Sequence, residues 1–112
     1  MESEVEKRIE KIKQLDKQSN LKMLIEARDY AKKMAKLVSE FPNADYVTLQ
    51  FYNKAKETIK LCSSLIKALK LSKKANSKVV EKHVEKVKKI ILNINFLIQH
   101  EPQMRIGFLK PI

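Results

Sequence analysis

The sequence predicts an all-α protein, an antiparallel up-down-up bundle of three long helices with a short helix at the N-terminus. The 112 residues include one glycine and three prolines, too few turn-forming residues for a fold built of many strands. Hydrophobic residues make up 44% of the chain, enough for one core in a domain of this length. Many recur at alternating spacings of three and four residues, the pattern of helices packed side by side. We therefore expect one bundle over residues 1–101 and an apolar tail over residues 102–112.

The first expected helix, over residues 4–16, begins with a capping box. In such a box the hydroxyl of Ser3 accepts a hydrogen bond from the backbone amide of Glu6, and the Glu6 carboxylate reaches back to the amide of Ser3. The apolar stripe of this helix is thin and consists of Val5, Ile9 and Ile12. Because a thin stripe buries little surface, we expect this helix to fray or to lie across the others.

Three longer helices are expected over residues 21–40, 45–71 and 77–100. Their apolar spacing averages 3.5 residues per turn, which predicts a shallow left-handed crossing between them. The repeating positions are Leu24, Ala27, Ala31, Met34, Val38 and Phe41, then Tyr52, Ala55, Ile59, Cys62, Ile66 and Leu69, then Val84, Val87, Ile91, Ile94 and Ile98. The connections are short, so consecutive helices should run in opposite directions.

The ends of these helices are predicted from prolines and from side chains that can accept a backbone hydrogen bond. Proline lacks the amide hydrogen that a helix interior needs, whereas Asn, Asp and Ser favour the capping position. The expected stops are Pro42 and Pro102, and the expected caps are Asn43 or Asp45 and Asn76 or Ser77.

No catalytic or metal-binding constellation can be assembled from the sequence. Cys62 would need a base and an exposed, electropositive setting to act as a nucleophile, but its seam position is that of a small core residue. His83 and His100, with one cysteine, make no zinc ligand set. We therefore expect a protein that is not an enzyme and that holds no metal or cofactor.

From the sequence we expect neither a secretory signal nor a segment long enough to span a membrane. A single cysteine cannot form an intramolecular disulfide, and the N-terminus lacks a basic segment followed by an apolar run and a cleavage site. The longest apolar stretch, near residues 89–99, has about half the length of a membrane span. A cytoplasmic, intracellular protein with no membrane partner is expected.

The charge of the chain points to polyanions as partners. The formal net charge is +11, from 24 basic and 13 acidic residues, and only three of the basic residues are arginines. Such an excess attracts nucleic acid or acidic protein surfaces. Lysine contacts phosphates as a point charge, so we expect backbone contacts to DNA or RNA rather than base reading by paired arginine bonds.

The positive charge is concentrated in the second half of the chain. Residues 54–89 contain twelve lysines and three acidic residues. A solvated helix face usually mixes signs, but here lysines repeat at helical spacing and repel one another. We expect a basic strip, about 20 Å or more in length, on the helices over residues 45–71 and 77–100 and on the loop between them. Its lysines are Lys56, Lys60, Lys67, Lys70, Lys73, Lys74, Lys78, Lys82, Lys86 and Lys89.

Aromatic residues near the start of the helix over residues 45–71 have two interpretations. Tyr46, Phe51 and Tyr52 lie close together in the sequence and beside lysines. They either stack on unpaired bases or close the end of the bundle, which is the commoner use of such residues.

The C-terminal tail is more apolar than a free terminus should be. Its candidate partner-binding residues are Ile106, Phe108, Leu109 and Ile112. Such a peptide either folds back over the bundle or docks into a groove of a protein partner. Apolar residues beyond the seam, Phe96 and Leu97, also leave open a homodimer.

Parts of the three long helices resemble a known interaction module. The segments "ARDYAKKMA", "PNADY" and "FYNKAKETIKL" are similar to the three-helix microtubule interacting and transport domain. That resemblance implies binding of short helical peptides in a groove between helices. In size, charge and helicity the chain also resembles the small subunits of CRISPR effector complexes, which line a nucleic-acid filament.

The sequence therefore yields two functional hypotheses. The first is a non-enzymatic accessory subunit of a nucleic-acid-processing complex, with lysines on the nucleic-acid backbone and another surface on a larger protein partner. The second is a protein-interaction adaptor of the microtubule interacting and transport type, which binds acidic or helical peptides.

Overall fold

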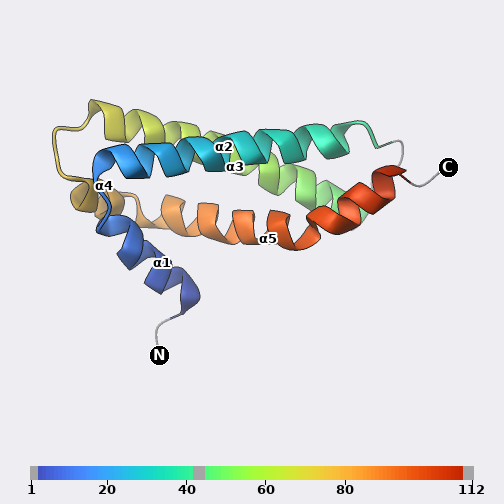
Figure 1. The fold of residues 1–112 in the computed structure, drawn as a ribbon, viewed down its shortest axis with the longest axis horizontal. Coiled ribbons are helices and arrows are strands. Elements are labelled where there is room, and N and C mark those ends of the chain that lie inside the picture. Colours follow the sequence, from blue (N-terminus) through green and yellow to red (C-terminus); the bar gives the residue numbers. More distant parts are fainter. Residues whose placement is uncertain (1–2, 42–44, 110–112) are drawn as a thin grey trace.

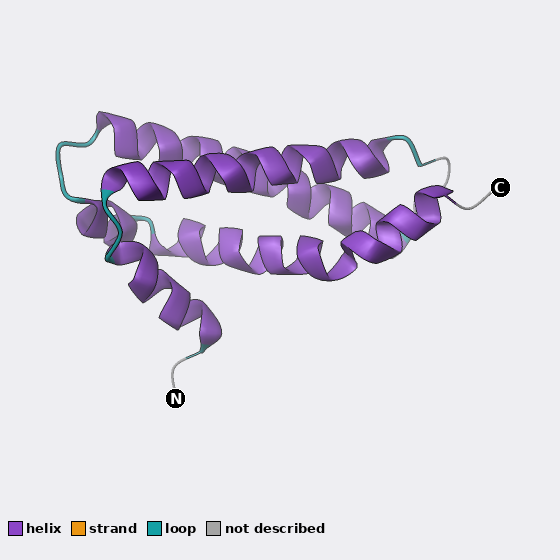
Figure 2. Cartoon of the chain, viewed as in Figure 1, coloured by secondary structure: helices purple, strands orange, loops and turns teal. Residues whose placement is uncertain are grey.

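The chain is all-helical over the residues that its structure, a computed structural model, describes, namely 3–41 and 45–109. Figure 2 shows helices joined by short loops, and no strand occurs in these two ranges. The elements are α1 (Glu4–Lys13), α2 (Lys17–Ser39), α3 (Tyr46–Leu71), α4 (Asn76–Lys82) and α5 (Val84–Leu109).

The three long helices α2, α3 and α5 lie along the length of the molecule (Figure 1). The α2–α3 connection is at one end, and the α3–α4 connection is at the other. Helix α3 packs against both α2 and α5, whereas α1 projects at an angle and packs against α4 and α5. The molecule measures 52 × 34 × 18 Å and is therefore elongated.

Three of the helices begin at a side-chain cap. The oxygens of Ser3, Asp16 and Asp45 accept hydrogen bonds from the backbone amides of Glu6, Ser19 and Thr48, at 3.1, 2.7 and 2.8 Å. The caps expected at Ser3 and Asp45 are confirmed. The expected start of the second helix at residue 21 is wrong, because Asp16 caps a helix that begins at Lys17.

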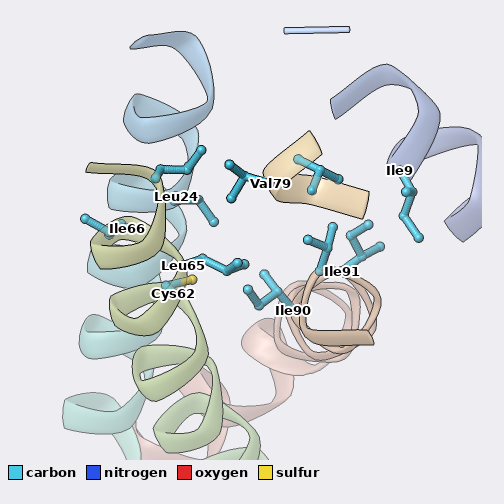
Figure 3. Close-up of a cluster of buried hydrophobic side chains, with 11 residues drawn as sticks. Ile9, Leu24, Cys62, Leu65, Ile66, Val79, Ile90 and Ile91 are labelled. Atoms are coloured by element: carbon cyan, nitrogen blue, oxygen red, sulfur yellow. The ribbon is translucent and has the colours of Figure 1, made fainter. Parts of the chain in front are cut away.

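The core consists of two clusters of buried apolar side chains. One gathers residues of all five helices, and Figure 3 shows its side chains converging from α1, α2, α3, α4 and α5. Cys62 belongs to it and is fully buried, as its seam position predicts. The other cluster lies around Met34, Phe51, Leu97 and Met104 and joins α2, α3 and α5.

A buried polar link ties α1 to α2 and α4. Asn20 donates a hydrogen bond to the Oδ1 of Asn76 at 2.6 Å, and Asn76 donates to the carbonyl oxygen of Ile12 at 2.7 Å. Asn76 is therefore a connector between helices and not the expected cap of α4, whose capping residue is Ala75. Neither does Ser77 cap α4, because it lies inside that helix.

The expected helix over residues 77–100 is interrupted at His83. The backbone of His83 departs from helical geometry, with φ −118° and ψ 29°, and its Nδ1 lies 2.9 Å from the carbonyl oxygen of Val79. In Figure 3, α4 lies crosswise to α5, which is seen nearly along its axis. The break at His83 lets α4 turn so that Val79 and Val80 are buried beside α1. The helix over residues 77–100 is therefore not continuous.

The final helix does not end at Glu101 as expected, because α5 continues through Pro102 to Leu109. Proline removes one helical hydrogen bond, but contacts on both sides hold the last turns in place. Glu101 accepts hydrogen bonds from Tyr30 and Arg105, at 2.7 and 2.8 Å, and Met104 is 2% exposed. Burial of Met104 thus favours the helix over a separate tail.

The inward face of α5 also differs from the expected one. Ile98 was expected in the core but is 57% exposed, whereas Leu97 is fully buried. From Ile94 the seam continues through Leu97, Glu101 and Met104, spaced by three, four and three. The apolar residues around these positions would allow either Leu97 or Ile98 to face the core. Leu97 faces inward because the helix extends to Met104, which lies on the same side. Leu97 is therefore unavailable for the homodimer seam.

Candidate nucleic-acid interface

The outer face of α3 carries a row of lysines. Lys56, Lys60, Lys67 and Lys70 are all exposed, and their spacings of four, seven and three place them on one face of the helix. The core residues of α3, among them Ala55 and Cys62, lie on its opposite side. We call these four lysines the α3 lysine row.

The α3 lysine row differs from the other helix surfaces in the sign of its charges. The exposed charged side chains on α2 include both lysines and acids. They are Lys22, Glu26, Asp29, Lys32, Lys33, Lys36 and, just after the helix, Glu40. In α3 the only acidic residue is Glu57, which is half-buried. Helices α2 and α3 have the same net positive charge, so the feature that distinguishes α3 is an exposed lysine face with no acidic residue on it.

Two lysines of α5 extend this surface across the α3–α5 junction. Lys86 donates a hydrogen bond to the hydroxyl of Ser64 at 2.9 Å, and the Nζ of Lys89 lies 3.5 Å from an oxygen of Glu57. These contacts place both lysines beside α3. Lys86 and Lys89 of α5 are therefore close to α3, as the expected basic strip requires.

Glu57 is held ionised by its surroundings. The side-chain amide of Asn93 donates to its Oε1 at 2.8 Å, and Lys89 and Lys54 lie nearby. The Asn93 hydrogen bond, followed by the positive charge of Lys89 and Lys54, lowers the pKa of the Glu57 carboxyl despite its partial burial. Glu57 therefore neutralises part of the α5 contribution and helps to join the two helices.

The remaining predicted lysines do not form one line with Lys86 and Lys89. The break at His83 separates Lys78 and Lys82 from α5, and Lys78 pairs with Glu81 at 3.9 Å. The lysines expected on one helix over residues 77–100 are therefore divided between α4 and α5.

Lys73 and Lys74 lie at the end of the molecule where α3 is joined to α4. Both are exposed, and with Lys13 and Lys17 they border a shallow hollow of about 560 Å³. Lys17 donates to the carbonyl oxygen of Ser72 there. This end is a second basic surface that continues from the α3 lysine row.

The aromatic residues are divided between core and surface. Phe51 is fully buried, and the Nζ of Lys56 lies 5.9 Å from the centre of the half-buried Tyr52 ring. Tyr46 is 73% exposed at the start of α3. Of these three residues, Phe51 belongs to the core, whereas the Tyr46 side chain is largely exposed.

The C-terminal candidate residues lie in or beyond the last turns of α5. Ile106 is 57% exposed. Phe108 and Leu109 are part of the helix, and Ile112 lies outside the described residues.

Sequence reasoning missed two features of these surfaces. The Nζ of Lys54 lies 5.2 Å from the centre of the Phe96 ring, which itself stacks on His100. Tyr46 and Leu49 at the start of α3 lie at the same end as α5's last turns, because Thr48 donates to the sulfur of Met104 at 3.7 Å. The antiparallel order expected of consecutive helices already suggests that the start of α3 lies near the end of α5. The contact with Met104 was not expected, because the last helix was predicted to stop before Pro102.

The described residues also bear on catalysis, metals and membranes. Burial raises the pKa of the Cys62 thiol to about 11, so the thiol stays protonated at neutral pH. No group of three or more His, Cys, Asp or Glu residues within residues 3–41 and 45–109 is arranged to hold a metal ion. In the same part of the chain, no helix combines the length and apolar character needed to cross a membrane.

Comparisons with protein-family models, with curated proteins and with solved structures return no match to this chain.

Proposed function

We propose that the protein is a non-enzymatic accessory subunit that binds the backbone of DNA or RNA through the α3 lysine row. Lys86 and Lys89 flank that row, and Lys73 and Lys74 continue it at one end. In the same proposal, α2, α3 and α5 form an up-down-up antiparallel bundle, which makes α3 a straight support for the charges.

The observation that carries this proposal is the absence of acidic residues from the outer face of α3. A face that serves only solubility gains nothing from repulsion between like charges at helical spacing, and α2 shows the mixed alternative within the same molecule. Repulsion along α3 is relieved when the lysines contact phosphates. The face is therefore suited to a polyanion.

The geometry of the row suits a run of phosphates. From Lys56 to Lys70 the helix rises about 21 Å, a length over which a duplex presents about a dozen phosphates. Lysine forms no paired bonds to base edges, so the contacts give affinity with little sequence preference.

The proposal assigns a larger protein partner to the end of the bundle where α3 starts and α5 finishes. Tyr46, Leu49 and Ile106 are 73%, 51% and 57% exposed there. Exposed apolar residues at one end of a molecule are available for contact with a protein partner. This surface is away from the lysines of the second basic end.

The alternative is a protein-interaction adaptor that binds acidic or helical peptides. The same exposed apolar residues and the same positive charge support it. It differs from the first proposal in its ligand, so one experiment addresses both.

The decisive measurement is binding of the purified protein to single-stranded and double-stranded DNA and RNA over a salt series. With about four or five phosphates neutralised, the slope of log K against log salt for duplex DNA should be about −4. The triple variant Lys56→Glu, Lys60→Glu, Lys67→Glu should remove this binding while the thermal unfolding midpoint stays within a few degrees.

A charge-matched control uses α2. The triple variant Lys22→Glu, Lys33→Glu, Lys36→Glu changes the net charge by the same amount on an exposed helix face. It should weaken binding only slightly. Equal losses of affinity in the two variants would show that binding depends only on net charge. Absence of binding at low salt would favour the adaptor.

A further inference from the structure

A cavity of about 420 Å³ lies where α1 meets the rest of the bundle. All five helices contribute to its walls, and nearly all of the lining is aliphatic. It reaches from the partly buried Ile12 and Ala27 down to the buried core residues Leu65, Val80 and Ile91. The space is partly open to the surface, so it is a groove of ligand size rather than a void enclosed in the core.

The charged residues of the lining are both cationic. Arg8 and Lys11, on α1, line the cavity and are exposed, so the cavity reaches the surface beside them. Arg8 donates to the Oδ1 of Asn95 on α5 at 3.4 Å, a long hydrogen bond between exposed groups. An anionic group at the mouth could replace this contact with a stronger one.

The wall of the cavity also contains an unpaired acceptor. Asn20 is 3% exposed, and its Oδ1 has no hydrogen-bond partner among the described residues, although its amide donates to Asn76. An acceptor of this kind needs a donor, which a bound water molecule can supply at the polar end of a ligand.

We propose that this cavity binds a single-chain anionic amphiphile of the fatty-acid type. The alkyl chain would occupy the aliphatic interior, and the carboxylate would lie between Arg8 and Lys11. Sites of about 300–1,000 Å³ with apolar walls and a few polar groups are typical of small-molecule ligands. An alkyl chain matches the aliphatic interior and leaves no polar group of its own buried there.

The test is calorimetric titration with sodium decanoate and with uncharged 1-decanol, both below their aggregation limits. One equivalent of decanoate should bind saturably and raise the thermal unfolding midpoint. Between hexanoate and decanoate, each added CH₂ should strengthen binding about fourfold. The absence of saturable binding, or of chain-length dependence, would overturn the proposal.

Variants separate the interior from the mouth. Ala27→Leu fills the cavity and should abolish binding of both probes, and circular dichroism will show whether it folds as the parent does. Arg8→Gln with Lys11→Gln should weaken decanoate about tenfold or more and leave decanol unchanged, whereas Lys33→Gln on α2 should change neither. This second pair keeps the proposal testable if Ala27→Leu fails to fold.

Two other results would assign the surface differently. Several equivalents of decanoate that bind equally to all variants would indicate adsorption to the basic surface. A dimer in sedimentation that Ala27→Leu dissociates would assign the cavity to a second copy of this chain. Either result would contradict a fatty-acid site.

Discussion

Single polar residues inside the bundle decide how α1 is held. Asn76 is 4% exposed and joins Ile12 of the first helix region to Asn20 of the second through two hydrogen bonds. Such an arrangement is specific, because a buried amide must find partners in fixed directions. The residue type of Asn76 predicts a helix cap. In the structure Asn76 connects helices instead, and Val79 and Val80 of the same helix are buried.

Replacing Asn76 by alanine should lower the free energy of unfolding by about 1–3 kcal/mol, because it leaves the buried Asn20 amide unpaired and removes a hydrogen bond to the Ile12 carbonyl. Urea denaturation measures this change. The exposed Asn53→Ala on α3 serves as control and should remain within about 0.5 kcal/mol of the parent. An Asn76→Ala protein as stable as the parent would contradict the polar link.

Alkaline pH should destabilise the fold through Cys62. The folded-state pKa of about 11 lies above the ordinary 9.0, so the unfolded chain loses its proton first. Stability is therefore unchanged by this thiol below pH 9 and falls as the pH rises toward 11, by about 2–3 kcal/mol at most.

The contribution of Cys62 is isolated with Cys62→Ala, which lacks the thiol but keeps Tyr30, whose pKa is also raised, chiefly by burial. The loss of stability between pH 9 and 11, followed by urea denaturation, should be smaller in the variant. Parallel curves for the two proteins would show that the thiol is not buried.

At the scale of elements, the last two turns of α5 change the meaning of the C-terminal segment. Pro102 predicts a stop, yet Glu101 and Arg105 pair across it and Met104 enters the core. Burial of Met104, about 1.5–3 kcal/mol, together with the hydrogen bonds of Tyr30 and Arg105 to Glu101, offsets the cost of about 3 kcal/mol that a proline imposes inside a helix. The segment therefore stabilises the bundle instead of forming a separate peptide.

A pair of substitutions two residues apart, on opposite sides of α5, tests this conclusion. Met104→Ala should lower the free energy of unfolding by about 2–5 kcal/mol, since it opens a cavity in a closed cluster. Ile106→Ala, at a position 57% exposed, should cost about 0.5 kcal/mol or less. Chemical denaturation distinguishes them, and equal small effects would mean that α5 ends before Met104.

The whole molecule is more extended than a compact domain of its length. Its radius of gyration is 15.5 Å, against about 13 Å for a spherical domain of this number of residues. The long helices and the angled α1 account for the difference (Figure 1). Elongation gives the protein much lysine-bearing surface for its mass.

Small-angle X-ray scattering of the monomer should therefore return a radius of gyration near 15.5 Å with an elongated profile. The measurement is made over a dilution series, which separates shape from association. A value near 13 Å would indicate that α1 folds against the bundle and closes the cavity, and a value that falls on dilution would indicate a dimer.

The sequence by itself determined the features that depend on neighbouring residues. The helical class, the caps at Ser3 and Asp45 and the burial of Cys62 follow from local hydrogen-bonding chemistry and from apolar spacing. The lysine spacing of α3 was readable in the same way. These features require only that a helix form and that one face of it be covered.

The tertiary structure alone decided where those local rules are overridden. The break at His83, the helix through Pro102, the choice of Leu97 over Ile98 and the cavity beside α1 depend on contacts between residues far apart in sequence. The local alternatives differ by only about a few kcal/mol, so the burial of one or two distant side chains selects between them. Such differences are settled by packing, which spacing along a single chain does not reveal.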